Sequence, residues 1–125
     1  MKVVDAGVVV ELLVGGLDPQ RLGHEELAAP HLVDSEVTHV LRGLARRGVI
    51  DAEQGGLAME GFMRLTLTRF PADGLRPRMW ELRDNLSAYD ATFVALAELT
   101  DATALLTTDA RLANAPGPRC RIELL

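Results

Sequence analysis

Apolar residues along the chain fall either in short continuous runs or at helical spacing, and this pattern predicts strands separated by helices. The run at residues 3–4 predicts a short buried strand, and the apolar segment 6–14 predicts a helix that ends at Gly15. A second continuous run, residues 104–108, predicts another buried strand, and the alternating segment 119–124 predicts a last one.

Capping residues indicate where further helices begin. Asp34 or Ser35 is expected to cap a second helix that stops at Gly48, and Asp51 is expected to open a third helix through a capping box with Gln54.

The second half of the chain continues the same alternation. Residues 65–68 alternate like a strand, a helix contains Met79 and Trp80, and Ser87 caps the next helix. Residues 29–31 are expected to interrupt regular structure. This order predicts one α/β domain over residues 1–125, with a mainly parallel central sheet flanked by helices.

Composition narrows the class of protein without revealing a function. The chain is 48% hydrophobic and 25% charged, which is typical of a soluble globular domain. No apolar run approaches the roughly 18 residues of a membrane span, and the N-terminus does not resemble a signal peptide, so we expect a cytoplasmic protein with no membrane partner. The only cysteine, Cys120, cannot form an internal disulfide and is expected to be a small buried side chain.

Four acidic residues are expected to meet at one edge of the sheet. Asp5 and Asp109 each end an apolar strand, and ligands of α/β sheets collect beyond the carboxyl ends of strands. Glu36 and Asp90 each fall in the first turn of an expected helix, whose N-terminus points toward the same edge.

Such a cluster favours metal-dependent phosphoryl transfer. Carboxylates that repel one another need protons or hard cations, and oxygen ligands favour Mg²⁺ or Mn²⁺ over zinc. A divalent ion can activate water for attack on phosphorus, and a second ion can stabilise the leaving oxygen. Each acid also has a simpler interpretation as a helix cap, and only the four together make the metal site the better hypothesis. Asp34, Asp84 and Asp101 are assigned to capping or solvent because they follow no buried strand.

The segments around these acids resemble the PIN domains, most closely the VapC-type toxins of bacterial toxin–antitoxin pairs. Four segments carry the likeness in the family's order: residues 3–11, 29–37, 82–91 and 105–112. The resemblance covers nearly the whole chain, and its last two segments are the most specific.

The resemblance implies a Mg²⁺- or Mn²⁺-dependent endoribonuclease. By this likeness Asp5, Glu36, Asp90 and Asp109 would be the metal ligands, and the Thr108 hydroxyl would orient a water or a ligand. The family also implies an RNA substrate, a homodimer and a cognate antitoxin that blocks the active-site groove.

One position departs from the family pattern. Gly7 stands where the family usually has a small hydroxyl or amide residue, and the loss of such support commonly costs roughly 10- to 100-fold in metal affinity or activity. A catalytically silent RNA- or protein-binding module is therefore the alternative hypothesis. An aspartyl phosphatase is disfavoured, because it would need a second Asp at position 7.

Net charge and aromatic content add little to the prediction of function. The net charge of −5 at first disfavours nucleic acid, but two bound divalent ions would nearly neutralise it. Arg83 and Arg111 lie in the motif segments and are the candidates for contact with RNA or the antitoxin. Trp80 and Tyr89 are expected to pack in the core, since aromatic residues make up only 4% of the chain.

Overall fold

The computed structural model describes residues 1–125, and its centre is a five-stranded, fully parallel sheet. The strands lie in the order β3-β2-β1-β4-β5. Their bounds are Lys2–Val4 (β1), Leu27–Pro30 (β2), Thr68–Phe70 (β3), Ala104–Thr107 (β4) and Ile122–Leu124 (β5).

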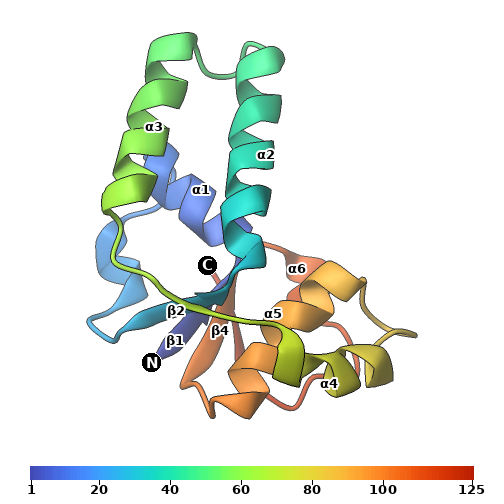
Figure 1. Ribbon diagram of the computed structural model, residues 1–125. Helices are drawn as coiled ribbons and strands as arrows, with labels where there is room; N and C mark the ends of the chain where they lie inside the picture. The colour runs from blue at the N-terminus through green and yellow to red at the C-terminus, as the bar shows by residue number, and fades with distance from the viewer.

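Six helices surround the sheet. Figure 1 shows α2 and α3 projecting side by side from the sheet, while α5 lies against it near α4 and α6. The expected α/β architecture with a parallel sheet and flanking helices is confirmed. The helices are α1 (Ala6–Val14), α2 (Leu32–Arg46), α3 (Ala52–Arg64), α4 (Arg76–Glu81), α5 (Ala88–Leu99) and α6 (Ala110–Ala113), and two short 3₁₀ turns cover Pro19–Leu22 and Asp73–Leu75. No helix is long and apolar enough to cross a membrane.

The strand order creates a switch point between β1 and β4. From β1 the chain proceeds to β2 and β3 on one side, whereas β4 and β5 lie on the other side. Chain connections on the two sides of a switch point run in opposite directions and leave a crevice at the carboxyl ends of the strands. Asp5 follows β1 and Asp109 follows β4, so both acids lie at this crevice.

The central strands are buried on both faces, as a parallel sheet requires. Val3, Val4, Leu105 and Leu106 are at most 1% exposed, and residues 91–97 of α5 are all buried. Because α5 is apolar nearly all round, it is held between the sheet and the outer helix α4.

Two strands differ from the prediction. Residues 27–30 form β2, where an interruption was expected, since pairing with β1 and β3 overrides the weak strand propensity of Ala28 and Ala29. Pro30 is the last residue of the strand, a position at which its missing N–H is tolerated. The expected strand at 65–68 instead begins at Thr68, because Leu65 still caps α3.

Helix α2 begins earlier than predicted. Its first residue is Leu32 and its N-cap, His31, makes no side-chain capping bond, so neither Asp34 nor Ser35 is the cap. The Asp34 carboxylate instead accepts two hydrogen bonds from the Arg69 guanidinium, at 2.7 and 2.8 Å. Glu36 consequently lies in the second turn of α2 rather than in the first.

The prediction that Trp80 and Tyr89 pack in the core is wrong. Trp80 is 68% exposed and Tyr89 is 62% exposed. The Arg83 guanidinium stacks over the Trp80 ring, 4.5 Å from its centroid, and donates to the Trp80 carbonyl. Both aromatic rings are therefore available to partners. Cys120, in contrast, is partly buried and packs against the core.

The capping box that opens α3 predicts a measurable loss of stability. Asp51 Oδ1 accepts from the Gln54 N–H, and the Gln54 side chain accepts from the Asp51 N–H. Asp51→Ala should lower the free energy of unfolding by about 1 kcal/mol, or roughly 4 °C in melting temperature. Asp84→Ala, an exposed acid, is the control and should melt like the wild type. Equal melting of both variants would contradict the assigned cap.

Candidate active site

Asp5 is held rigidly between β1 and α1. As the N-cap of α1, its Oδ1 accepts from the Val8 N–H at 2.9 Å, while its Oδ2 accepts from the Thr107 hydroxyl. Its own N–H donates to the Leu106 carbonyl of β4 at 3.1 Å. These bonds hold the carboxylate against the end of the neighbouring strand.

Thr107 joins the first and last acids of the site. It is fully buried at the end of β4, and its hydroxyl oxygen accepts from the Asp109 N–H at 3.0 Å while it donates to Asp5. One hydroxyl therefore fixes the Asp5 carboxylate and the backbone from which Asp109 projects.

Asp109 and Asp90 lie at the N-terminal ends of two helices at this edge. Asp109 is the N-cap of α6, and its Oδ1 accepts from the Arg111 N–H at 2.8 Å. Asp90 lies in the first turn of α5, where its N–H donates to the Ser87 hydroxyl, as predicted for that helix start. Both acids line one pocket of about 390 Å³ with Ser87 and Arg111.

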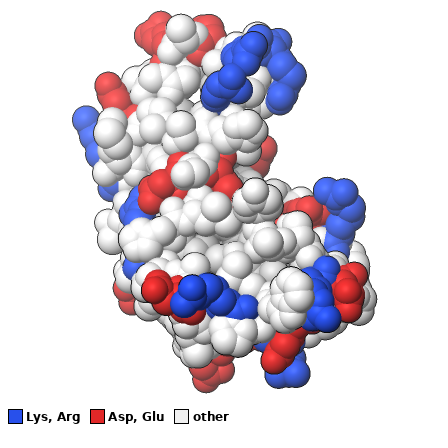
Figure 2. All heavy atoms as spheres, turned by 45° about the vertical axis from the view of Figure 1, so that its right-hand side comes forward, with Lys and Arg blue, Asp and Glu red and all other residues white.

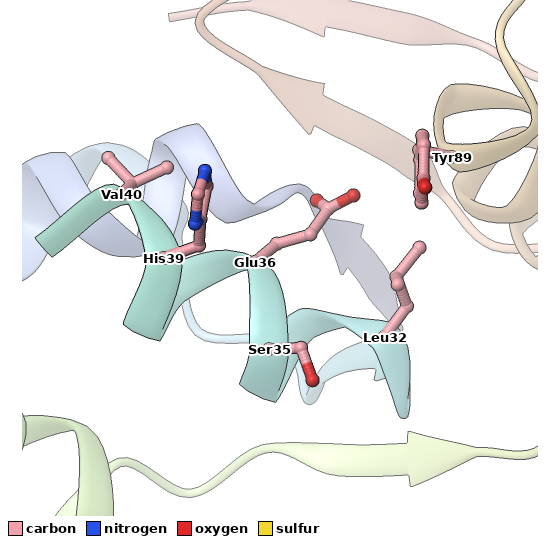
Figure 3. A pocket seen from close by; sticks show the side chains of 6 residues that line it. All are labelled: Leu32, Ser35, Glu36, His39, Val40 and Tyr89. Carbon is pink, nitrogen blue, oxygen red and sulfur yellow. The ribbon is translucent and has the colours of Figure 1, made fainter. Parts of the chain in front are cut away.

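Glu36 reaches the site from the opposite wall. It lines a groove of about 600 Å³ whose other residues include Leu32, His39 and Tyr89. In Figure 3 the Glu36 carboxylate projects from α2 into the space between α2 and α5, with Tyr89 on the far side. Because Tyr89 precedes Asp90 on α5, this groove and the Asp90 pocket are neighbours.

Burial and repulsion by neighbouring acids raise the pKa of three of these carboxyl groups. Burial is the largest cause that raises the pKa of Asp5, and the charges of Asp90 and Asp109 raise it further. The pKa of Glu36 is raised by burial and then by Asp90 and Asp5, and that of Asp90 by burial and then by Asp109. Asp90 and Asp109 therefore lie close enough to Asp5 for their charges to act on it, and Asp90 and Asp5 act in the same way on Glu36.

Arg111 is the only basic residue that offsets this negative charge. The Arg111 N–H lowers the pKa of Asp109, with a further contribution from its guanidinium 3.5 Å away. Asp5, Glu36 and Asp90 have no ion-pair partner. In the present side-chain positions, no three acidic, histidine or cysteine side chains are grouped closely enough to hold one ion.

The surface is hollowed where the projecting helices meet the body of the molecule. Figure 2 shows acidic atoms gathered near this junction, while most of the basic side chains visible in this view lie away from it. An anionic ligand that entered the hollow would meet unneutralised carboxylates unless a cation accompanied it.

Comparison with known proteins decides the family. The family model described as the PIN domain matches residues 2–118. The chain belongs to the PIN-domain family.

Several relatives of this PIN domain carry the name VapC. It is 44% identical to ribonuclease VapC9 of Mycobacterium tuberculosis, over 100% of this chain and 98% of the relative. It is 41% identical to ribonuclease VapC1 of the same organism, over 98% and 96% of the two chains. The resemblance to VapC-type proteins found in the motif segments is thus confirmed along the whole chain.

Solved structures share the fold. The protein PAE2754 from Pyrobaculum aerophilum matches with a TM-score of 0.71 and 25% identity, over 97% of this chain and 81% of that one. VapC20 of Mycobacterium tuberculosis, described as a toxin that cleaves the sarcin-ricin loop, matches with a TM-score of 0.65 over 90% and 93% of the two chains. At 16% identity the latter likeness supports the fold alone.

Within this PIN domain, sequence analysis overlooked Thr107. It singled out Thr108, but β4 ends at Thr107, whose side chain points inward and whose hydroxyl contacts Asp5. Thr108 is exposed and its hydroxyl lies beside Gly7. Successive side chains of a strand point to opposite faces, so only one of the two adjacent threonines can point inward. The continuous apolar run that leads into residue 107 was the signal that could have indicated Thr107.

The raised pKa of Asp5 predicts how stability changes with pH in the metal-free PIN domain. A carboxyl whose pKa is higher in the folded state binds more protons when folded, so its contribution to stability is present at acid pH and is lost as pH rises through the folded pKa. Asp5→Asn should therefore gain stability relative to the wild type as pH rises from acid to neutral. Thermal melting with EDTA measures this difference, with Asp84→Asn as control, and a pH-independent difference would contradict it.

Proposed function

We propose that this PIN domain is the toxin of a type II toxin–antitoxin pair and acts as a Mg²⁺- or Mn²⁺-dependent endoribonuclease. The observation that carries the proposal, in a chain with VapC relatives, is how the four acids are placed: Thr107 links Asp5 to the Asp109 backbone, Asp90 lines a pocket with Asp109, and Glu36 lines the neighbouring groove. Water would attack a phosphodiester of the RNA.

The residues present fit a divalent cation. Their donor atoms are all carboxylate oxygens, which favour Mg²⁺ or Mn²⁺. The raised pKa values of Asp5, Glu36 and Asp90 reflect burial first and then repulsion by neighbouring acids, none of the three forms an ion pair, and a bound cation would relieve the repulsion. Since the carboxylates do not yet form a ligand group, small side-chain movements would accompany binding.

Each part of the site then has a separate task. Asp5, Glu36, Asp90 and Asp109 would hold one or two cations, which would make a water more acidic and offset the charge at phosphorus. Thr107 holds the Asp5 carboxylate and the Asp109 backbone at a fixed distance from each other through its two hydrogen bonds. The groove lined by Leu32 and Tyr89 would receive the RNA beside the scissile phosphate.

We also propose the macromolecules that this PIN domain binds. The VapC family implies a cognate antitoxin that covers the groove and a homodimer in solution. Arg111 is 93% exposed beside Asp109 and could contact an RNA phosphate or an antitoxin carboxylate. Arg83, stacked on the exposed Trp80, presents a flat cationic surface suited to either partner.

Cleavage of cellular RNA tests the proposal. The purified protein, freed of antitoxin, is incubated with total RNA and Mn²⁺ or Mg²⁺, and new RNA ends are mapped by sequencing. We expect discrete cuts that disappear when EDTA is added. Intact RNA from a folded protein that also fails to bind Mn²⁺ would overturn the enzyme and leave the silent binding module.

A further inference from the structure

Three arginines at the C-terminal end of α2 have no acidic partner within the protein. Arg42, Arg46 and Arg47 are all exposed, and none of them forms an ion pair. Arg69 and Arg78, in contrast, are each bound to a carboxylate. We call the three free arginines the basic end of α2. In a chain with a net charge of −5, they form a local excess of positive charge that is available to an external anion.

The basic end of α2 lies above the groove that contains Glu36. Glu36 and Val40 line this groove, and Gly43 continues the same face of the helix, because residues three or four apart lie side by side. The Arg47 side chain folds back over Gly43, with Nη1 3.1 Å from the point where a Cβ of residue 43 would lie. At 1.5 Å per residue, Gly43 is about 10 Å beyond Glu36 along the helix axis. A guanidinium group therefore lies two turns from Glu36, on the helix face that lines the groove.

Arg42 lies on a second groove that joins the first. It lines this polar groove with Thr38 and His39, and both Ser35 and His39 also line the Glu36 groove. Arg46 follows Arg42 by one helical turn. The two grooves therefore give a continuous surface from the arginines to Glu36.

The same surface continues to the other acids. Tyr89 lines the Glu36 groove, and its neighbour Asp90 lines the pocket that contains Asp109 and Arg111. Figure 2 shows a group of basic side chains at the far end of the projecting helices, at the rim of the hollow, with acidic atoms at the junction. Positive charge is therefore present on both sides of the carboxylates.

An RNA strand needs positive charge outside the carboxylate site. Cations bound by the acids offset the charge at the scissile phosphate, but the neighbouring phosphates still approach an acidic protein. Arginine binds phosphate oxygens through its planar fork of N–H groups. At a rise of about 3.4 Å per nucleotide in a stacked strand, the 10 Å between Glu36 and Gly43 corresponds to roughly three nucleotides.

We propose that the basic end of α2 binds the phosphate backbone of the RNA substrate, and that the strand runs from there across the Glu36 groove to the carboxylates. This inference rests on the proposed function, because it takes the substrate to be RNA. An acidic segment of the antitoxin is the competing occupant. RNA is favoured because the arginines lie on the surface that leads to the carboxylates, where the scissile phosphate has to be placed.

The salt dependence of RNA binding tests this role without catalysis. A labelled single-stranded RNA of mixed sequence is titrated with the protein in EDTA, and fluorescence anisotropy gives the affinity at several salt concentrations. Each phosphate contact adds about 0.7 to the slope of log affinity against log salt, so Arg42→Gln/Arg47→Gln should reduce that slope by about 1.4 and weaken binding. Arg21→Gln/Arg64→Gln removes equal charge from exposed positions outside these grooves and should bind like the wild type.

Cleavage of total cellular RNA with Mn²⁺ gives a second readout. Because the basic end of α2 holds the strand equally in the ground state and the transition state, Arg42→Gln/Arg47→Gln should raise the apparent KM several-fold and leave kcat unchanged. The positions of the cuts should also stay the same, since phosphate contacts carry no sequence information. Mn²⁺ affinity measured by calorimetry should equal that of the wild type.

The outcomes separate this inference from the function on which it rests. If the wild type cleaves RNA and the two double variants have the same salt slope, the role of the basic end is wrong and the nuclease proposal stands. Unchanged RNA binding with a loss of antitoxin binding would assign the surface to the antitoxin and also overturn the inference. A wild type that binds no RNA at the lowest salt concentration would overturn it as well. If the wild type binds RNA with the expected slopes but cuts none, the RNA surface stands and the nuclease proposal fails.

Discussion

Asp90→Asn is expected to reduce RNA cleavage by more than about 100-fold, since removal of even an outer partner of a metal ligand commonly costs 10- to 100-fold. The charge of Asp90 raises the pKa of Asp5 and of Glu36, and the charge of Asp109 raises the pKa of Asp90. An amide at position 90 removes the negative charge that acts on both Asp5 and Glu36. Mn²⁺ affinity should fall together with the cleavage rate.

The fold should survive this substitution. The cap of α5 uses the Asp90 N–H and the Ser87 hydroxyl, and both remain in the variant. Removing a charge from a buried, repelling cluster should also leave the metal-free protein at least as stable as the wild type. Asp84→Asn, an exposed acid five residues after Met79, is the matched control. Wild-type cleavage by a folded Asp90→Asn would contradict the assigned role.

Thr107→Val is expected to lower Mn²⁺ affinity and cleavage by roughly 10- to 100-fold, although Thr107 is fully buried and touches no substrate. Valine keeps the shape of the side chain but removes the donor to Asp5 and the acceptor for the Asp109 N–H. Because the Thr107 hydroxyl lowers the pKa of Asp5, its loss should raise that pKa further. Asp5 would then hold its proton to higher pH.

We expect the defect of Thr107→Val in Mn²⁺ affinity to depend on pH. Protons compete with the cation for Asp5, so the defect should be largest at acid pH and should shrink as pH rises. Thr107→Ser retains the hydroxyl and should follow the wild-type profile. A loss of affinity that is the same at every pH would indicate a general disturbance of β4 instead of a specific effect on Asp5.

The sequence was sufficient to predict the features that depend on burial and order along the chain. Asp5 and Asp109 could be placed at one sheet edge because each follows a continuous apolar run, and parallel strands end at the same edge. The Asp51 and Ser87 caps were also predictable, because capping chemistry is local.

Features that depend on tertiary contacts were not predictable. The middle of strand β2 consists of two alanines that pair with the strands on either side, and α2 begins without a side-chain cap. Asp34 looked like a cap because its actual partner, Arg69, lies 35 residues away. The choice between Thr107 and Thr108 required the point at which β4 ends, which local patterns locate poorly.

The exposed aromatic rings were misjudged for a related reason. Low aromatic content favours burial on average, yet Tyr89 precedes Asp90 on α5 and therefore stands at the groove. Its place opposite Glu36 (Figure 3) is consistent with the proposed contact between the groove and RNA bases, which stack on aromatic rings.

The most direct test of the central claim is anomalous diffraction from crystals of the antitoxin-free protein soaked in Mn²⁺. We expect an anomalous peak within coordination distance of carboxylate oxygens of Asp5, Asp90 and Asp109, with Glu36 beside it directly or through water. The peak should be absent in Asp90→Asn crystals treated in the same way. Mn²⁺ bound elsewhere, with this crevice empty at a saturating concentration, would contradict the claim that these carboxylates form the catalytic centre.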